Sequence, residues 1–246
     1  MYYEKYGDNK RNILILPGWG NTRETFNFFI NNLKSNNTVY IVDYPLFGNS
    51  KFVNRDLTIY DYAELIFKFI KQKKLNNLTI ISHSFGCRIA IILDSVYNVC
   101  IEKFVIIDGA GIKPKKKFKA KLKTRIYKLL KKISHVLPKK LKKKYLDFII
   151  NIFASIDYKN LKENERKTFS NIVNEDLTKY LDKIKCETLI IWGNKDIDTP
   201  LSDAYLMNEK IPISSLIVLD NATHFSYLDY PYRVLSILKI YIEKNN

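Results

Sequence analysis

Cysteine, histidine and long uncharged apolar runs are scarce in this sequence of 246 residues, and each scarcity excludes a class of protein. The three cysteines, Cys87, Cys100 and Cys186, are odd in number, widely spaced and set in apolar stretches. They predict reduced core cysteines in a cytoplasmic protein and not a disulfide framework. Because no two ligand-type residues have the spacing of a metal site, we expect no bound metal.

No stretch approaches the 18 or so uncharged apolar residues of a membrane-spanning helix, so none is expected. The first residues include Glu4 and Lys5 and contain no apolar core of a signal peptide, so none is predicted there. The length suits one α/β domain with an insertion. The hydrophobic content of 46% is ample for a buried core.

Positive charge is concentrated in one segment. Residues 113–144 contain 16 Lys and Arg and no acidic residue, whereas the rest of the chain has 25 basic and 25 acidic residues. The net charge of +16 therefore belongs to this segment alone. Its apolar residues recur every three or four positions, which predicts helices with one apolar face and lysines on the others.

Short apolar runs alternate with amphipathic stretches along most of the chain. The apolar runs predict strands at 2–6, 12–16, 38–42, 78–81, 101–107, 187–192 and 215–219. The stretches between them predict helices, and this alternation is typical of an α/β fold with a mostly parallel, doubly wound sheet. The alternation stops after Ile112. We therefore expect a core of residues 1–112 and 181–246, with a helical insert of residues 113–180.

The stretch Leu78–Ala90 places Ser84 at the apex of a tight turn between an apolar strand and a helix. Ser82 and Gly86, two residues to either side, are small enough to let strand and helix approach closely. This spacing resembles the nucleophile elbow, G-x-S-x-G, of the α/β-hydrolase superfamily, with Ser82 in place of the first glycine. The resemblance implies that Ser84 is a nucleophile at the positive end of a helix dipole. The simpler interpretation is an ordinary serine-containing turn.

A second turn, Pro17–Asn21, follows the predicted strand at 12–16. It is similar to the H-G-x-G oxyanion loop of the same superfamily, with Pro17 where histidine is common. The resemblance implies that the backbone N–H groups of Trp19 and Phe85 form an oxyanion hole. By itself, the same turn is also explained as a turn with a packed indole.

A serine hydroxyl needs a base to remove its proton, and only three histidines are present. His83 adjoins the elbow serine, and its side chain is expected to point away from the apex. His135 lies among lysines, where a solvated side chain is expected. His224 follows the last predicted strand, where the base of α/β-hydrolases is found, so the resemblance implies that His224 is the base.

The acid that orients the base is expected from the loop after the strand at 187–192. Asp196 matches the W-G-x-x-D-x-x-x-P loop of the superfamily, and the order Ser84, Asp196, His224 is the order expected of this fold. Two competitors remain. Asp198 is more typical of a loop-capping residue, and Asp108 follows the strand from which some family members take the acid.

The resemblance covers nearly all of residues 12–111 and 181–246. Residues 108–114, 156–159 and 224–228 are also similar to bacterial α/β-hydrolases without an assigned substrate. We expect a serine hydrolase of the carboxylesterase type (EC 3.1.1) that acts on a small or acyl-chain ester through an acyl-enzyme and without a cofactor. An alternative with the same triad is hydrolysis of a carbon–carbon bond in dienoic acids.

In α/β-hydrolases, an insert at the position of residues 113–180 commonly forms a helical lid over the active site and sets substrate choice. Its lysines at 113–144 are explained most simply as a solvated face. They also suit an anionic membrane surface or an acidic partner such as acyl carrier protein. In that second alternative, the lid is a docking surface and the triad is idle. Nucleic acid is not an expected partner, because the segment has an apolar stripe and is not a groove reader.

Overall fold

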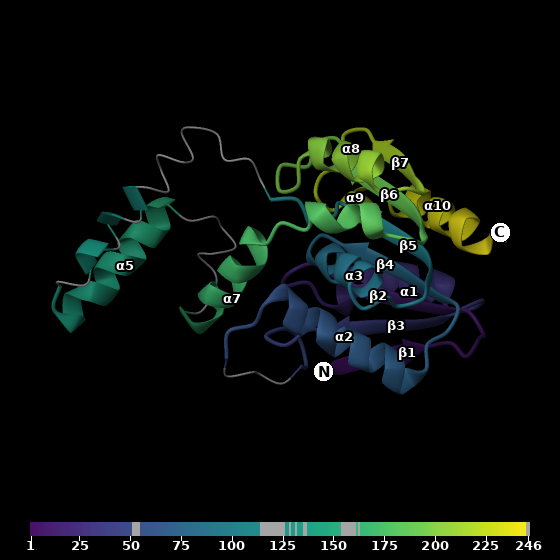
Figure 1. Ribbon diagram of the computed structural model, residues 1–246, viewed down its shortest axis with the longest axis horizontal. Coiled ribbons are helices and arrows are strands. Elements are labelled where there is room, and N and C mark those ends of the chain that lie inside the picture. The colour runs from purple at the N-terminus through teal and green to yellow at the C-terminus, as the bar shows by residue number, and fades with distance from the viewer. Residues whose placement is uncertain are drawn as a thin grey trace. The chain divides into compact units, whose positions relative to one another are not determined.

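The computed structural model describes residues 1–50, 55–113, 126–127, 129–130, 132–134, 137–153, 161 and 163–244 (Figure 1). His135, residues 156–159 and, from the apolar stripe expected before Pro138, Phe118 and Leu122 lie outside these residues. The chain divides into two compact units, one of residues 1–112 and 175–246 and the other of residues 113–174. Residues 175–180 thus group with the core and not with the insert.

A seven-stranded sheet forms the core of the larger unit (Figure 1). Its strands in chain order are β1 (Tyr2–Tyr6), β2 (Asn12–Leu16), β3 (Thr38–Asp43), β4 (Leu78–His83), β5 (Ile101–Ile107), β6 (Glu187–Gly193) and β7 (Ser214–Leu219). Their order in the sheet is β1-β3-β2-β4-β5-β6-β7, and only the edge strand β1 is antiparallel to its neighbour. The predicted mostly parallel α/β sheet is confirmed.

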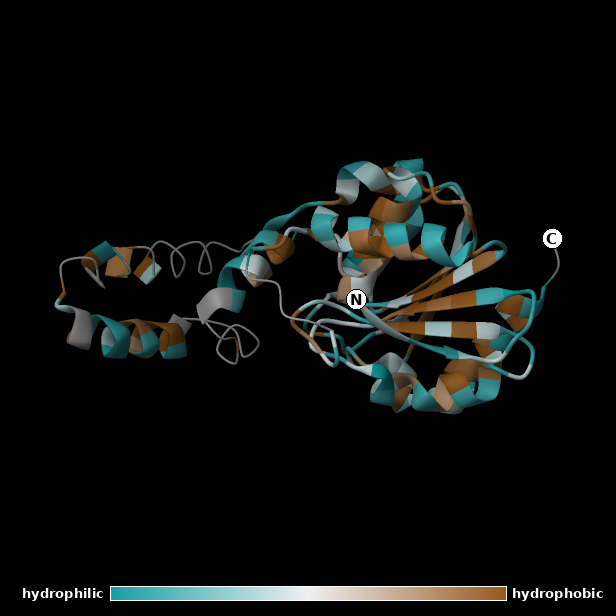
Figure 2. Cartoon of the chain, turned by 90° about the horizontal axis from the view of Figure 1, so that it is seen from below, coloured by the Kyte–Doolittle hydropathy of each residue, from teal (hydrophilic) through white to brown (hydrophobic). Residues whose placement is uncertain are grey.

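Helices cover both faces of this sheet, which is why its central strands are apolar on both sides (Figure 2). Alternate strand residues such as Ile13 and Ile15 pack against α1 (Asn27–Leu33), α9 (Ser226–Asp229) and α10 (Pro231–Glu243). The opposite face carries the remaining helices of this unit, which are α2 (Ile59–Lys73), α3 (Phe85–Ser95) and α8 (Leu201–Lys210).

Local sequence signals set the helix ends. Thr58 begins α2 with a capping box: its hydroxyl accepts the N–H of Asp61, and the Asp61 carboxylate accepts the N–H of Thr58. Lys74 ends the same helix in a left-handed conformation. The stretch expected to form one helix over 24–34 instead divides into a 3-10 turn, η1 (Arg23–Phe26), and α1.

The insert enters and leaves the larger unit at one point. The N–H of Leu177 donates to the carbonyl of Gly111 at 2.9 Å, which joins the outgoing and returning segments. Arg88 of α3, a buried residue, donates to the carbonyl of Glu175 at 2.8 Å. Tyr60 of α2 donates to the carboxylate of Glu175 at 3.0 Å. The returning segment is thus fixed to the two helices beside the elbow.

Two helices are described within the insert, α5 (Lys139–Phe153) and α7 (Glu163–Asn174). Among the described residues, no helix combines the length and the apolar character needed to span a membrane.

One expectation about the cysteines is wrong. Cys87 and Cys186 are buried, but Cys100, in the loop immediately before β5, is exposed. All three are free thiols.

Candidate active site

Ser84 lies at the turn between β4 and α3, with backbone angles φ 47° and ψ −112°. A non-glycine residue in this region costs about 1–3 kcal/mol, so neighbouring structure must hold it there. The N–H of Ser84 donates to the carbonyl of Ile107 at 3.2 Å, and its carbonyl accepts the N–H of Ala110 at 3.0 Å. The segment at the end of β5 therefore holds both backbone polar groups of the strained residue, its N–H and its carbonyl.

Gly86 and Ser82, the two small residues of the elbow, meet different steric and hydrogen-bonding requirements. A Cβ atom on Gly86 would lie 2.0 Å from the carbonyl oxygen of Leu16, so the first turn of α3 approaches the end of β2 too closely for any side chain. Ser82 is fully buried, and its hydroxyl donates to the carbonyl of Val105 at 3.0 Å. Serine is accommodated at this position because β5 supplies an acceptor for its hydroxyl.

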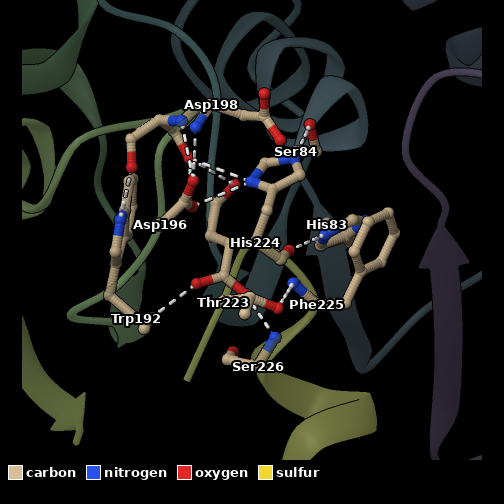
Figure 3. A network of polar contacts seen from close by, with 12 residues as sticks. His83, Ser84, Trp192, Asp196, Asp198, Thr223, His224, Phe225 and Ser226 are labelled. Carbon is tan, nitrogen blue, oxygen red and sulfur yellow. Dashed lines mark hydrogen bonds and ion pairs between the residues drawn. The ribbon is translucent and has the colours of Figure 1, made fainter. Parts of the chain in front are cut away.

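The structure brings Ser84, His224 and Asp196 together (Figure 3). Nε2 of His224 lies 2.9 Å from Oγ of Ser84, and Nδ1 lies 2.8 Å from Oδ2 of Asp196. The three residues come from the loops after β4, β7 and β6, which end at the same edge of the sheet. The arrangement allows His224 to take a proton from Ser84 while Asp196 holds the imidazole in one tautomer.

Four hydrogen bonds converge on the carboxylate of Asp196. Its Oδ1 accepts the N–H groups of Asp198 and Thr199 at 2.8 and 2.9 Å. Its Oδ2 accepts the Thr199 hydroxyl at 2.7 Å as well as the imidazole N–H of His224. The sequence reasoning missed Thr199. The signal that was available is the Asx turn, in which an aspartate bonds to the backbone two or three residues later.

His224 and Asp196 each stabilise the charged form of the other. Burial by itself disfavours a charge on His224, but the hydrogen bond that the imidazole donates to Asp196 and the negative charge of Asp196 outweigh burial and raise the pKa of the imidazole. Burial also disfavours a charge on Asp196, but the hydrogen bond and charge of His224, with the bonds from Thr199, lower the pKa of its carboxyl. Asp196 therefore stays ionised beside a base that readily accepts a proton.

Trp19 and Phe85, the expected oxyanion residues, lie beside each other. Their rings meet edge to face with centroids 5.3 Å apart. Phe85 is the first residue of α3, so its N–H belongs to the helix end that has no intrahelical acceptor. Trp19 lies in a turn closed by the N–H of Asn21 and the carbonyl of Gly18 at 3.2 Å. Phe85 thus directly follows Ser84 and Trp19 packs against its ring, and their role as oxyanion donors stays a prediction.

The competing residues occupy other positions. Asp198 is exposed, and it contacts Asp196 through its backbone N–H. Asp108 is fully buried, and its two carboxylate oxygens accept the N–H groups of Gly193 and Ser226 at 2.8 and 3.0 Å. Neither carboxylate bonds to the imidazole of His224, whose acidic partner is Asp196.

Among the residues described, one group of potential metal ligands has its donor atoms within 4.8 Å of one another: Asp196, Asp198 and His224. Two of these donors, Nδ1 of His224 and an oxygen of Asp196, already bond to each other. A cation at this place would compete with that hydrogen bond, so we assign the cluster to the triad geometry and to no metal.

The chain belongs to the alpha/beta hydrolase family, whose family model matches residues 13–237. The resemblance and the fold expected from it are confirmed.

Relatives with assigned names include esterases. The chain is 25% identical to the pimeloyl-(acyl-carrier protein) methyl ester esterase of Wigglesworthia glossinidia brevipalpis, over 100% of this chain and 99% of the relative. It is 26% identical to the putative esterase/lipase 2 of Mycoplasma pneumoniae, over 78% of this chain and 73% of the relative. An esterase structure from Exiguobacterium antarcticum superimposes with a TM-score of 0.76, at 23% identity, and covers 99% of this chain and 95% of that one. The protein is thus a member of a hydrolase family with esterase relatives.

Proposed function

We propose that this protein is a carboxylic ester hydrolase that works through an acyl-enzyme on Ser84. The observation that carries the proposal is the hydrogen-bonded series from Ser84 Oγ through the His224 imidazole to Asp196, with separations of 2.9 and 2.8 Å. The esterase relatives support the same reaction class.

In the proposed reaction, Oγ of Ser84 attacks the ester carbonyl while Nε2 of His224 takes its proton. The tetrahedral oxyanion accepts hydrogen bonds from the backbone N–H groups of Trp19 and Phe85. His224 then gives the proton to the departing alcohol, which leaves an acyl group on Ser84. A water molecule deprotonated by His224 releases the acid, and Asp196 keeps the imidazole oriented throughout. No cofactor is needed for any of these steps.

Intact mass after treatment with a fluorophosphonate probe tests the proposal. We expect one covalent adduct on the wild type and none on Ser84→Ala. Ser95→Ala, at the far end of the same helix, should keep the adduct. A wild-type protein that is folded and remains unlabelled contradicts the mechanism. A panel of esters of increasing chain length, with a 2-hydroxy-6-oxo dienoate beside them, then separates ester hydrolysis from carbon–carbon bond hydrolysis.

A second proposal concerns the partner. Two relatives are named pimeloyl-(acyl-carrier protein) methyl ester esterases, and carrier-linked substrates fit the cluster of lysines at residues 113–144. The described part of this cluster includes Lys143 and Lys144, both exposed on α5. We propose that an acidic carrier protein presents the acyl ester and that these lysines attract it.

The dependence of turnover on salt concentration tests whether an acidic carrier protein is the partner. Turnover of a carrier-linked methyl ester should fall with ionic strength, and it should fall about tenfold in Lys143→Glu/Lys144→Glu through lost attraction. The matched control is Lys71→Glu/Lys210→Glu, a pair of exposed lysines on the larger unit. Equal loss for carrier-linked and free esters contradicts carrier recognition. Binding of the wild type to anionic vesicles, with no preference for the carrier, favours the membrane alternative.

We also propose a cytoplasmic location, which the three free cysteines support, because such thiols persist in a reducing compartment. Cell fractionation of the tagged protein tests this location. Recovery in an oxidising compartment contradicts it.

A further inference from the structure

His83, the residue immediately before Ser84, has no part in the proposed reaction and yet lies at the centre of the site (Figure 3). It ends β4 and is 1% exposed. Its ring packs against those of His224, Phe225 and Tyr227, with centroid separations of 5.0, 5.3 and 4.9 Å. A polar ring enclosed to this degree needs partners for both nitrogens.

Both ring nitrogens have such partners. Nε2 of His83 lies 2.8 Å from the carbonyl oxygen of His224. A carbonyl only accepts, so Nε2 carries the proton and Nδ1 is the acceptor. Nδ1 faces the side-chain amide of Asn21, which donates at 3.4 Å. The two bonds therefore fix one neutral tautomer.

The second bond reaches the turn that holds Trp19. A Cβ atom on Gly18 would lie 2.7 Å from Nδ1 of His83 and 2.9 Å from the Asn21 amide nitrogen. The glycine thus leaves room for the imidazole between β4 and the turn. This clearance of the His83 ring is a constraint on Gly18 in addition to the turn itself.

We infer that His83 is a positioning residue that sets the distance between Ser84 and His224 by holding the main chain of His224. It joins three parts of the site: the end of β4, the turn at Pro17–Asn21 and the loop after β7. This inference rests on the proposed function, since it concerns the geometry of the same serine and base.

Hydrogen bonds hold the loop on either side of His224. The carboxylate of Asp229 accepts the N–H of Thr223 at 2.6 Å, and Asp108 accepts the N–H of Ser226 at 3.0 Å. Of these main-chain bonds, the one from His83 acts on the backbone of residue 224 itself. Loss of that bond frees the carbonyl of His224 to rotate, and a displacement of about 1 Å in a reacting group costs on the order of 100-fold in rate.

His83 does not serve as a second base. Its Nε2 proton is committed to a carbonyl, and burial, followed by the nearby His224, lowers the pKa of its ring to about 3. The ring therefore stays neutral at every pH at which the site operates, and its contribution to the site is geometric.

Two substitutions separate the hydrogen bond from the bulk of the ring. The amide nitrogen of His83→Gln reaches about as far as Nε2 and can donate to the His224 carbonyl. His83→Met has similar volume and no donor. We expect kcat of His83→Met to fall about 10- to 100-fold with KM changed less than about threefold. We expect His83→Gln to recover most of the loss, and the fluorophosphonate labelling rate of Ser84 to follow kcat in both variants.

Thermal unfolding of the wild type, His83→Met and His83→Gln shows whether a loss of kcat accompanies a loss of stability, as a purely structural role would require. Equal kcat in His83→Met and wild type overturns the inference. So does an equal loss of kcat in the Met and Gln variants, because it means that the donor is not what matters. If wild type itself neither reacts with the probe nor hydrolyses any ester, the proposed function fails. If wild type reacts and His83→Met reacts equally fast, only the inference about His83 fails.

Discussion

The loops after β5 and β6 each carry an aspartate close to the end of the strand, and the two carboxylates meet different partners. Asp196, after β6, receives two main-chain N–H groups, the Thr199 hydroxyl and the imidazole of His224. Asp108, after β5, receives one main-chain N–H group on each oxygen, from the end of β6 and from the start of α9. The carboxylate of Asp196 thus bonds to a side chain that can carry charge, whereas the carboxylate of Asp108 bonds to main-chain N–H groups.

The different partners move the two pKa values in opposite directions. Burial raises the pKa of Asp108 to about 7, in spite of its hydrogen bonds from Ser226 and Gly193. Asp196 is also buried, but its imidazole partner and the bonds from Thr199 lower its pKa. A position at the carboxyl end of a strand is therefore not enough to make an aspartate the acid of a triad. We propose that the acid is Asp196, because its carboxylate faces a group able to become positive.

The strongest test of this comparison is Asp196→Asn. An asparagine keeps the shape but favours the wrong imidazole tautomer, so we expect kcat to fall about 10⁴-fold. The acidic limb of the pH–rate profile should move to lower pH, because the charge that raises the pKa of His224 is gone. Asp198→Asn, which changes an exposed carboxylate two residues on, should stay within about twofold of wild type. A small loss in Asp196→Asn would mean that another carboxylate serves as the acid.

Asp108→Ala should weaken the fold more than the chemistry. It leaves the buried N–H groups of Gly193 and Ser226 without an acceptor, so we expect a loss of about 3 kcal/mol in the free energy of unfolding. Urea denaturation measures this loss, and kcat at a temperature where the variant stays folded measures the rest. If kcat instead falls as far as in Asp196→Asn while stability is unchanged, Asp108 is the acid and the comparison is reversed.

The pH dependence of stability should distinguish the same two aspartates. Between pH 4 and 6, folded Asp108 keeps a proton that the unfolded chain has lost, so its contribution to stability decreases as pH rises, by up to about 1.4 kcal/mol per unit. Asp196 has a lowered pKa, so its contribution is lost only as pH falls below about 4. Unfolding measured across this window should therefore show a shallower decline in Asp108→Asn than in wild type. Parallel curves would contradict the raised pKa.

The smallest expected effect concerns Thr199. Thr199→Val removes one of four hydrogen bonds to Asp196 at nearly constant volume, which is worth about 1 kcal/mol, or about fivefold in kcat/KM. Thr199→Ser keeps the hydroxyl and should behave like wild type. Steady-state kinetics of the two variants give the comparison, and identical rates for Val and Ser would show that the hydroxyl adds nothing to the acid.

Much of the fold and the members of the candidate triad could be predicted because their signals are local. An apolar run, a serine between small residues and a W-G-x-x-D loop each occupy a few consecutive positions. The structure then brings Ser84, Asp196 and His224 together from the ends of three strands.

Thr199, three residues after Asp196, had a local signal in the Asx turn. The roles of Asp108 and His83 could not be predicted in the same way. Each depends on contacts between segments far apart in the chain, such as the bond between His83 and the backbone of His224, 141 residues away. The backbone carbonyl that receives this bond is present at every position of any sequence, so no residue type signals it. The exposure of Cys100 was missed for a related reason. Apolar neighbours in the sequence do not show whether a side chain just before a strand points into the core or into solvent.

The hydrogen bond between Leu177 and Gly111 joins the two segments of the larger unit between which the insert occurs in the sequence. Strands β5 and β6 stay paired in register, from Lys103 with Glu187 to Ile107 with Ile191, although the whole insert separates them in sequence. Each doubling of such a connection adds only about 0.6 kcal/mol of closure entropy. The insert between β5 and β6 can therefore be lengthened, shortened or replaced as a unit during evolution. The strand ends that carry the reactive groups keep their positions. The same junction is a natural graft point for an engineer who wishes to exchange recognition and retain chemistry.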